Sequence, residues 1–157
     1  MMKKLSLSSS LLDKLIDHEP DKIVGPNKTQ QQQLSDLYSS IHRDLEYLLN
    51  TRRLEFFQKS HHHLNSSLLN YGLPDLFNQP LSLDYQTEFI RKLRNAIDTF
   101  EPRLKNVEIF ILHHDDITER TLRFRITGWL HIDPAPALIT LDSTLNPENY
   151  SFQLTPA

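Results

Sequence analysis

The 157-residue chain has no cysteine, three glycines and no apolar run that approaches the roughly 20 residues of a membrane-spanning helix. The lack of cysteine excludes disulfides, thiolate zinc sites and cysteine nucleophiles, and it fits a reducing compartment. The P-loop, the dinucleotide-binding fingerprint and the GxSxG nucleophile elbow are absent as well. Neither sign of charge dominates, because 17 basic and 20 acidic residues give a formal net charge of −3. The composition therefore favours a cytoplasmic protein without membrane insertion or a nucleic-acid partner.

Two segments precede the part of the chain that is predicted to fold as a domain. Residues 1–17 carry a short apolar stripe behind a candidate serine N-cap, and the stripe consists of Leu11, Leu12, Leu15 and Ile16. A helix this short is marginal alone, so the stripe must pack either on its own domain or on a partner. Residues 18–33 contain two prolines, one glycine and a run of glutamines, which predict a flexible linker. The leading helix is thus predicted to be tethered to a domain of residues 34–157.

The domain begins with helical periodicity and continues with strand periodicity. A helix is predicted where apolar residues share about a third of the helical circumference: Leu34, Leu37, Tyr38, Ile41, Leu45, Leu48 and Leu49. A second helix is predicted from the spacing of Tyr85, Phe89, Leu93, Ala96, Ile97 and Phe100. Alternating residues predict antiparallel strands at 107–112, 121–132, 137–141 and 150–154, the last at an edge. The predicted fold class is α+β, with helices packed on one face of a small antiparallel sheet and a tethered N-terminal helix.

The junction between the second helix and the first strand has the sequence FEPRL at residues 100–104. Pro102 lacks an N–H and disfavours helical geometry at Glu101, so the helix is expected to end near Phe100 in a rigid corner. Glu101 and Arg103 place one acid and one base at this corner. They are either solvated at a helix C-terminus or bound to partners, because an unpaired buried charge is strongly unfavourable.

This corner also contains the acid that a glycosidase would need. A glycosidase uses two carboxylates about 5 to 9 Å apart, and Glu101 with Asp44 or Glu46 is the pairing that the sequence offers. Arg103 favours the charged form of Glu101, whereas a catalytic acid must be held protonated. Peptidoglycan hydrolysis through Glu101 is therefore the alternative hypothesis, and no catalytic residue is predicted.

The histidine-rich segments do not predict a metal site. The side chains of His61, His62 and His63 diverge on a helix and alternate faces on a strand, so they cannot reach one ion together. Residues 113–116, with the sequence HHDD, fit a solvated hairpin turn better than a set of ligands. No metal and no cofactor is therefore expected.

Three motifs, in this order and spacing, carry a resemblance to a known family: RDLEYLLNTRR at 43–53, YGLPDL at 71–76 and FEPRL at 100–104. Together they resemble the TssE family, the baseplate wedge subunits of bacterial type VI secretion systems. These subunits are similar to the small wedge protein of contractile-tailed phage baseplates. Residues 11–16 also resemble the family's N-terminal helix, whereas His42 departs from the pattern, because a basic residue is more usual there. The family has carried a lysozyme label, which the charge argument does not support here.

The resemblance implies a structural protein that joins the wedge core to the sheath and templates sheath polymerisation. Its implied partners are other baseplate wedge subunits and sheath subunits, and its implied place is the cytoplasm, in a baseplate docked at the inner membrane. Glu101, Pro102 and Arg103 are implied to hold contacts between wedge and sheath. The N-terminal helix is expected to dock into the core wedge subunits by a helix-in-groove mode.

Overall fold

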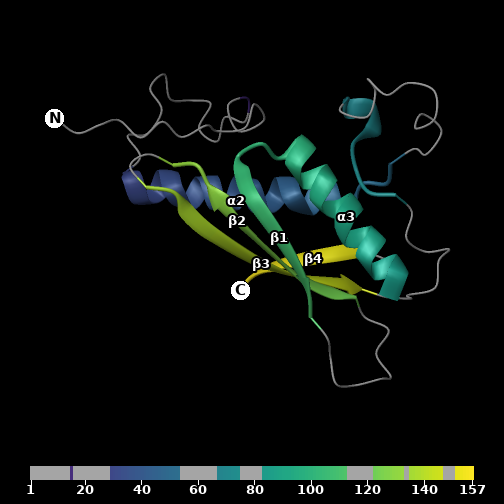
Figure 1. The fold of residues 1–157 in the computed structure, drawn as a ribbon. Helices are drawn as coiled ribbons and strands as arrows, with labels where there is room; N and C mark the ends of the chain where they lie inside the picture. The colour runs from purple at the N-terminus through teal and green to yellow at the C-terminus, as the bar shows by residue number, and fades with distance from the viewer. Residues whose placement is uncertain are drawn as a thin grey trace.

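The computed structural model describes Leu15 and residues 29–53, 67–74, 83–112, 122–132, 135–146 and 151–157. In these residues two α-helices pack on a four-stranded antiparallel sheet of strand order β1-β2-β3-β4 (Figure 1). The strands are β1 (Leu104–Ile111), β2 (Arg123–Leu130), β3 (Ala137–Asn146) and β4 (Ser151–Pro156). This arrangement confirms the predicted α+β class. The predicted N-terminal helix, apart from Leu15, and most of the predicted linker lie outside the described residues.

Helix α2 (Gln30–Asn50) begins earlier than its apolar pattern indicates. The Gln32 backbone N–H donates to the Thr29 side chain, and the Thr29 backbone N–H donates to the Gln32 side chain. This reciprocal capping extends the helix through residues 30–33, which the composition places in the linker. The buried face confirms the predicted apolar stripe and consists of Leu37, Ser40, Ile41, Leu45, Leu48 and Leu49.

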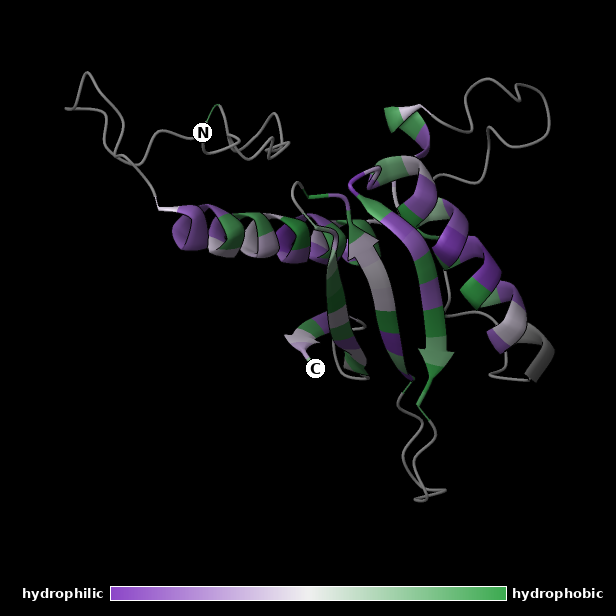
Figure 2. Ribbon diagram, turned by 60° about the vertical axis from the view of Figure 1, so that its left-hand side comes forward, coloured by the Kyte–Doolittle hydropathy of each residue, from purple (hydrophilic) through white to green (hydrophobic). Residues whose placement is uncertain are grey.

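Helix α3 (Leu83–Phe100) ends at the predicted residue and packs its apolar face on the sheet. Its Phe89 meets Phe124 of β2 and Phe152 of β4, with ring centroids 5.7 and 6.2 Å away. Buried apolar residues alternate with more exposed ones along the strands, so that the helices cover one face (Figure 2). The face away from the core carries Arg123, Arg125, Thr127 and Trp129, as the alternation predicts.

Strand β1 begins at Leu104, three residues before the predicted start. A register shift between Lys105 and Glu108 marks a bulge against β2, and Asn106 within it has a φ of 52°. Asparagine tolerates this left-handed conformation better than most residues. The bulge interrupts the two-residue period, which is why the pattern places the strand start later than the structure does. Gly128 lies on β2 opposite this irregularity.

The chain after α2 is held to the core through residues 71–74, inside the YGLPDL motif. The Arg53 N–H donates to the Leu73 carbonyl and the Leu73 N–H donates to the Thr51 carbonyl, both at 2.8 Å. Between these bonds Gly72 has a φ of +106°, and an added Cβ would lie 2.3 Å from the Thr51 carbonyl oxygen. Only glycine fits this position without moving the backbone.

We expect Gly72→Ala to destabilise the fold by at least about 2 kcal/mol, because the substitution adds both backbone strain and a clash with the Thr51 carbonyl. The measurement is urea unfolding followed by circular dichroism. Gly128→Ala is the matched control, because its Cβ would meet no atom closer than 3.4 Å. Its effect should stay within about 1 kcal/mol. Equal stability of Gly72→Ala and the parent chain would contradict the assigned role of Gly72.

Candidate functional site

The corner between α3 and β1 is a hydrogen-bonded turn. The Glu101 N–H donates to the Ile97 carbonyl at 2.8 Å and completes the last turn of the helix. The Leu104 N–H then donates to the Glu101 carbonyl at 3.1 Å, which places Pro102 at the second position of a four-residue turn. Proline suits that position because its fixed φ matches the turn. The local sequence therefore sets the corner, as predicted.

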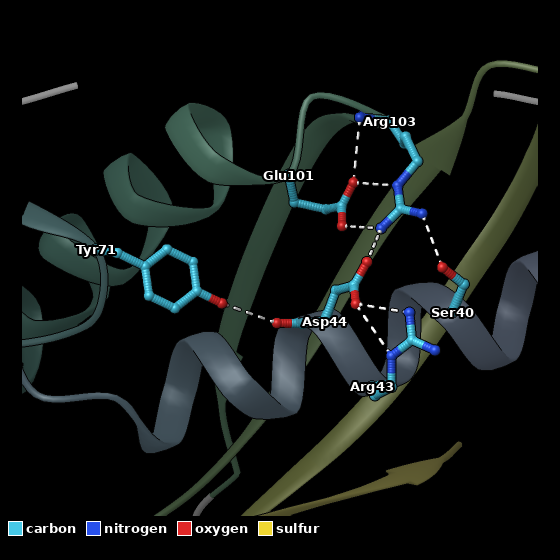
Figure 3. A network of polar contacts seen from close by, with 6 residues as sticks. All are labelled: Ser40, Arg43, Asp44, Tyr71, Glu101 and Arg103. Carbon is cyan, nitrogen blue, oxygen red and sulfur yellow. Dashed lines mark hydrogen bonds and ion pairs between the residues drawn. The ribbon is translucent and has the colours of Figure 1, made fainter. Parts of the chain in front are cut away.

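A charged network holds this corner against α2 (Figure 3). Arg103 Nε donates to Glu101 Oε1 at 2.5 Å and Arg103 Nη2 donates to Glu101 Oε2, so this pair is bidentate. The same guanidinium reaches α2, where Nη2 donates to Asp44 Oδ2 at 2.6 Å and Nη1 donates to Ser40 Oγ at 2.9 Å. Each guanidinium nitrogen thus has a partner, and Arg103 joins α2 to the α3–β1 corner.

The inner part of the network is shielded from water. Glu101 is 3% exposed and the Arg103 side chain is 13% exposed. Burial disfavours the charged form of Arg103, but the hydrogen bonds and charges of Glu101 and Asp44 outweigh burial and raise the pKa of Arg103. Of the two possibilities that the sequence left open at this corner, the described residues therefore favour bound charges over solvated ones.

Two further residues surround this centre. Arg43 Nε and Nη2 donate to Asp44 Oδ1 at 3.2 and 3.1 Å on the more exposed side. Tyr71 Oη donates to the Asp44 backbone carbonyl at 3.4 Å, and the Tyr71 ring packs edge-on against Phe100. Burial, followed by the negative charges of Asp44 and Glu101, raises the pKa of Tyr71. All three sequence motifs, at 43–53, 71–76 and 100–104, therefore meet in one network.

A comparison with known families identifies the class of protein. Residues 35–135 match the family profile described as baseplate wedge protein gp25. The chain belongs to this family. The match includes the whole charged network together with most of α2 and all of α3, β1 and β2. Searches of curated proteins and of solved structures found no significant match.

Membership of the gp25 family makes the chain a structural component of a baseplate wedge in a contractile injection machine, and its partners are other baseplate proteins. It is not an enzyme. The geometry of the wedge protein agrees, because Asp44 and Glu101, the pair considered for a hydrolase, both accept hydrogen bonds from Arg103. Both carboxylates are therefore engaged by the guanidinium of Arg103 in a structural network.

The part of the wedge protein that the structure describes contains no group of three or more metal-ligating side chains and no helix long and apolar enough to cross a membrane. The predicted histidine-rich segments at 61–63 and 113–116 lie outside the described residues.

The sequence identified the corner residues, and it named Asp44 as a carboxylate that could pair with Glu101, but it missed Ser40. Glu101 and Arg103 were singled out by their place around Pro102, which is itself exposed. Ser40, spaced one helical turn before Asp44, was not identified, although this spacing puts both on one face of α2. Of the predicted docking residues of the N-terminal helix, Leu15 is 74% exposed, whereas Leu11, Leu12 and Ile16 lie outside the described residues.

Helix α2 of the wedge protein also closes one edge of the sheet. Asn50 Nδ2 donates to the Phe152 carbonyl at 2.9 Å, and Asn50 Oδ1 accepts from the Phe152 N–H at 2.8 Å. His42 Nε2 lies 2.9 Å from the Leu154 carbonyl oxygen. Side chains of α2 thus bind the backbone of Phe152 and the carbonyl of Leu154, as another strand would bind them. His42, the departure from the resemblance motif, therefore has a role in this chain.

We expect Arg103→Ala to destabilise the fold by about 3–5 kcal/mol, because it leaves the carboxylate of Glu101 buried without its charged partner. Glu101→Ala should cost less, because Arg103 keeps its hydrogen bonds to Asp44 and Ser40. The outer residue provides the control, since Arg43→Ala removes a more exposed pair and should cost less than about 1 kcal/mol. Urea unfolding of the three variants gives the order, and a milder effect of Arg103→Ala than of Glu101→Ala would reject this account.

Proposed function

We propose that this protein is a TssE-type wedge subunit of a type VI secretion baseplate, which joins the wedge core to the sheath and templates sheath polymerisation. The observation that carries the proposal is the convergence of the three resemblance motifs on one charged network, in a chain of the gp25 family. In this proposal the baseplate acts in the cytoplasm, docked at the inner membrane, and the partners are other wedge subunits and sheath subunits.

The network supports such a role by making the corner rigid. Arg103 is bound to Glu101 on one side and to Asp44 on the other, so α2, α3 and β1 keep one relative position. Pro102 projects from this corner into solvent. A template must present a fixed surface, because flexible contacts lose conformational entropy on every binding event. Glu101, Pro102 and Arg103 would thus serve wedge–sheath contacts, with Pro102 at the contact and the ion pair as its support.

The N-terminal residues would bind a different neighbour. We assign the stripe of Leu11, Leu12, Leu15 and Ile16 to the core wedge subunits, where an apolar helix face would lie in a groove. The exposure of Leu15 agrees with an external partner. In this proposal the N-terminal stripe binds the core wedge subunits and the corner binds the sheath.

The role of the corner is tested with Arg103→Lys, which keeps the charge but loses the fork that binds Glu101 and Asp44 together. We expect assembled sheaths per cell to fall by at least about tenfold in this variant at a temperature where circular dichroism shows it folded. Sheaths are counted by fluorescence microscopy of a labelled sheath subunit. Arg91→Lys, at an exposed pair with Glu88, is the matched control and should assemble normally. A folded Arg103→Lys chain with a normal sheath count would refute the role of the corner.

The role of the N-terminal stripe is tested by deleting residues 5–17. Loss of the apolar face should reduce co-purification of the core wedge subunits by about tenfold or more, while the thermal unfolding of the domain stays unchanged. Leu11→Asp with Leu15→Asp, placed on the full-length chain, should act like the deletion. Retained co-purification in both variants would show that the stripe does not hold the core subunits.

A further inference from the structure

Strand β3 carries a polar side chain in the middle of the apolar core. Ser143 is fully buried, and its Oγ has no hydrogen-bond partner among the residues that the structure describes. Its direct cross-strand neighbours are Phe124 of β2 and Leu154 of β4, which are both buried and apolar. A hydroxyl that loses water on burial and gains no partner is unfavourable in the folded state. Ser143 therefore weakens the core that it helps to fill.

A second buried serine shows the more usual arrangement. Ser40 on α2 is 4% exposed, and its Oγ accepts a hydrogen bond from Arg103 Nη1 at 2.9 Å. The two serines are matched in size and burial and differ in whether the hydroxyl is bonded. Removal of the Ser40 hydroxyl leaves a donor of Arg103 without its acceptor, whereas removal of the Ser143 hydroxyl breaks no hydrogen bond. The same substitution should thus change stability in opposite directions at the two positions.

Ser143 also lies next to the more weakly packed of the two edge strands in the described sheet. Strand β4 buries two side chains, Phe152 and Leu154, whereas β1 at the other edge buries three. Less apolar surface is therefore exposed when β4 leaves the sheet than when β1 does. The pairing of Ser143 with Leu154 places the hydroxyl directly against this weaker edge.

Opening of β4 would return the Ser143 hydroxyl to water, because the paired Leu154 moves away with the strand. The opened state then regains a hydrogen bond that the closed state lacks. On its outer side β4 is held by α2, where Asn50 binds both backbone groups of Phe152 and His42 Nε2 lies 2.9 Å from the Leu154 carbonyl oxygen. Strand β4 is thus held by polar contacts outside and weakened by Ser143 inside.

We propose that Ser143 makes β4 a releasable strand, which leaves the sheet while β1, β2 and β3 stay paired. The serine does so by lowering the free energy of local opening at β4. The rest of the core persists, because Phe89 of α3 contacts Phe124 of β2 independently of β4, with ring centroids 5.7 Å apart. The inference concerns the fold of the wedge protein itself and does not depend on the type VI assignment.

Amide hydrogen exchange of the full-length chain tests the proposal. The Ala157 N–H donates to the Thr140 carbonyl, so the N–H groups of the odd-numbered residues of β4 face β3. Gln153 and Thr155 therefore report the pairing of β4, and Ile126 of β2, between two strands, reports the inner sheet. We expect protection factors at least about tenfold lower at Gln153 and Thr155 than at Ile126.

The role of the serine is tested by variants of the same chain. Ser143→Ala should lower the unfolding equilibrium constant and raise the protection factors of Gln153 and Thr155, each by about fivefold. Ser143→Cys should act in the same direction, because a thiol of similar size behaves as a small apolar group. Ser40→Ala is the matched control and should raise the unfolding constant.

Two results would overturn the proposal. Equal protection of Gln153, Thr155 and Ile126 in the parent chain would show that β4 opens only when the whole domain unfolds. An unchanged or higher unfolding constant in both Ser143→Ala and Ser143→Cys would show that the buried hydroxyl does not weaken the fold. Neither result bears on the proposed function, which the sheath counts test separately.

Discussion

The guanidinium of Arg103 is the point at which the two halves of the wedge protein are joined. It binds Glu101, which ends α3, and Asp44, which lies in the middle of α2. Because Glu101 is buried, the corner requires this pairing, since a buried carboxylate without a charged partner is strongly unfavourable. Beside this network the ring of Tyr71, from the YGLPDL motif, packs edge-on against the ring of Phe100, from the FEPRL motif. Glu101 and Arg103, which the family resemblance links to partner contacts, thus stabilise the fold of their own chain.

The same principle applies to the sheet, where side chains decide which backbone groups remain open. Asn50 and His42 of α2 bind the backbone of Phe152 and the carbonyl of Leu154, so α2 covers this part of the outer edge of β4. At the opposite edge of the sheet, a bulge at Asn106 interrupts the regular pairing of β1 with β2. An assembly subunit gains specificity from such limits, because a sheet with two free edges would pair with many strands.

The periodic parts of the fold were predictable because burial of one face imposes a period on the sequence. The buried stripe of α2 and the alternation of β2 follow from that constraint, whereas the end of α3 at Phe100 follows from Pro102. The early start of α2 depends on a capping box at Thr29 within a polar run, where no apolar period exists. The early start of β1 depends on a bulge, which breaks the period that identifies a strand.

The sequence by itself determined the α+β class, the proline corner and the opposite charges on either side of Pro102, since each depends on residues close together in the chain. Only the tertiary structure decided what those charges bind. Asp44 and Ser40 lie about sixty positions from Arg103, with separations of 59 and 63 residues, and no local rule couples them. Their meeting requires the packing of α2 against α3 and the sheet, which brings side chains together from separate parts of the chain.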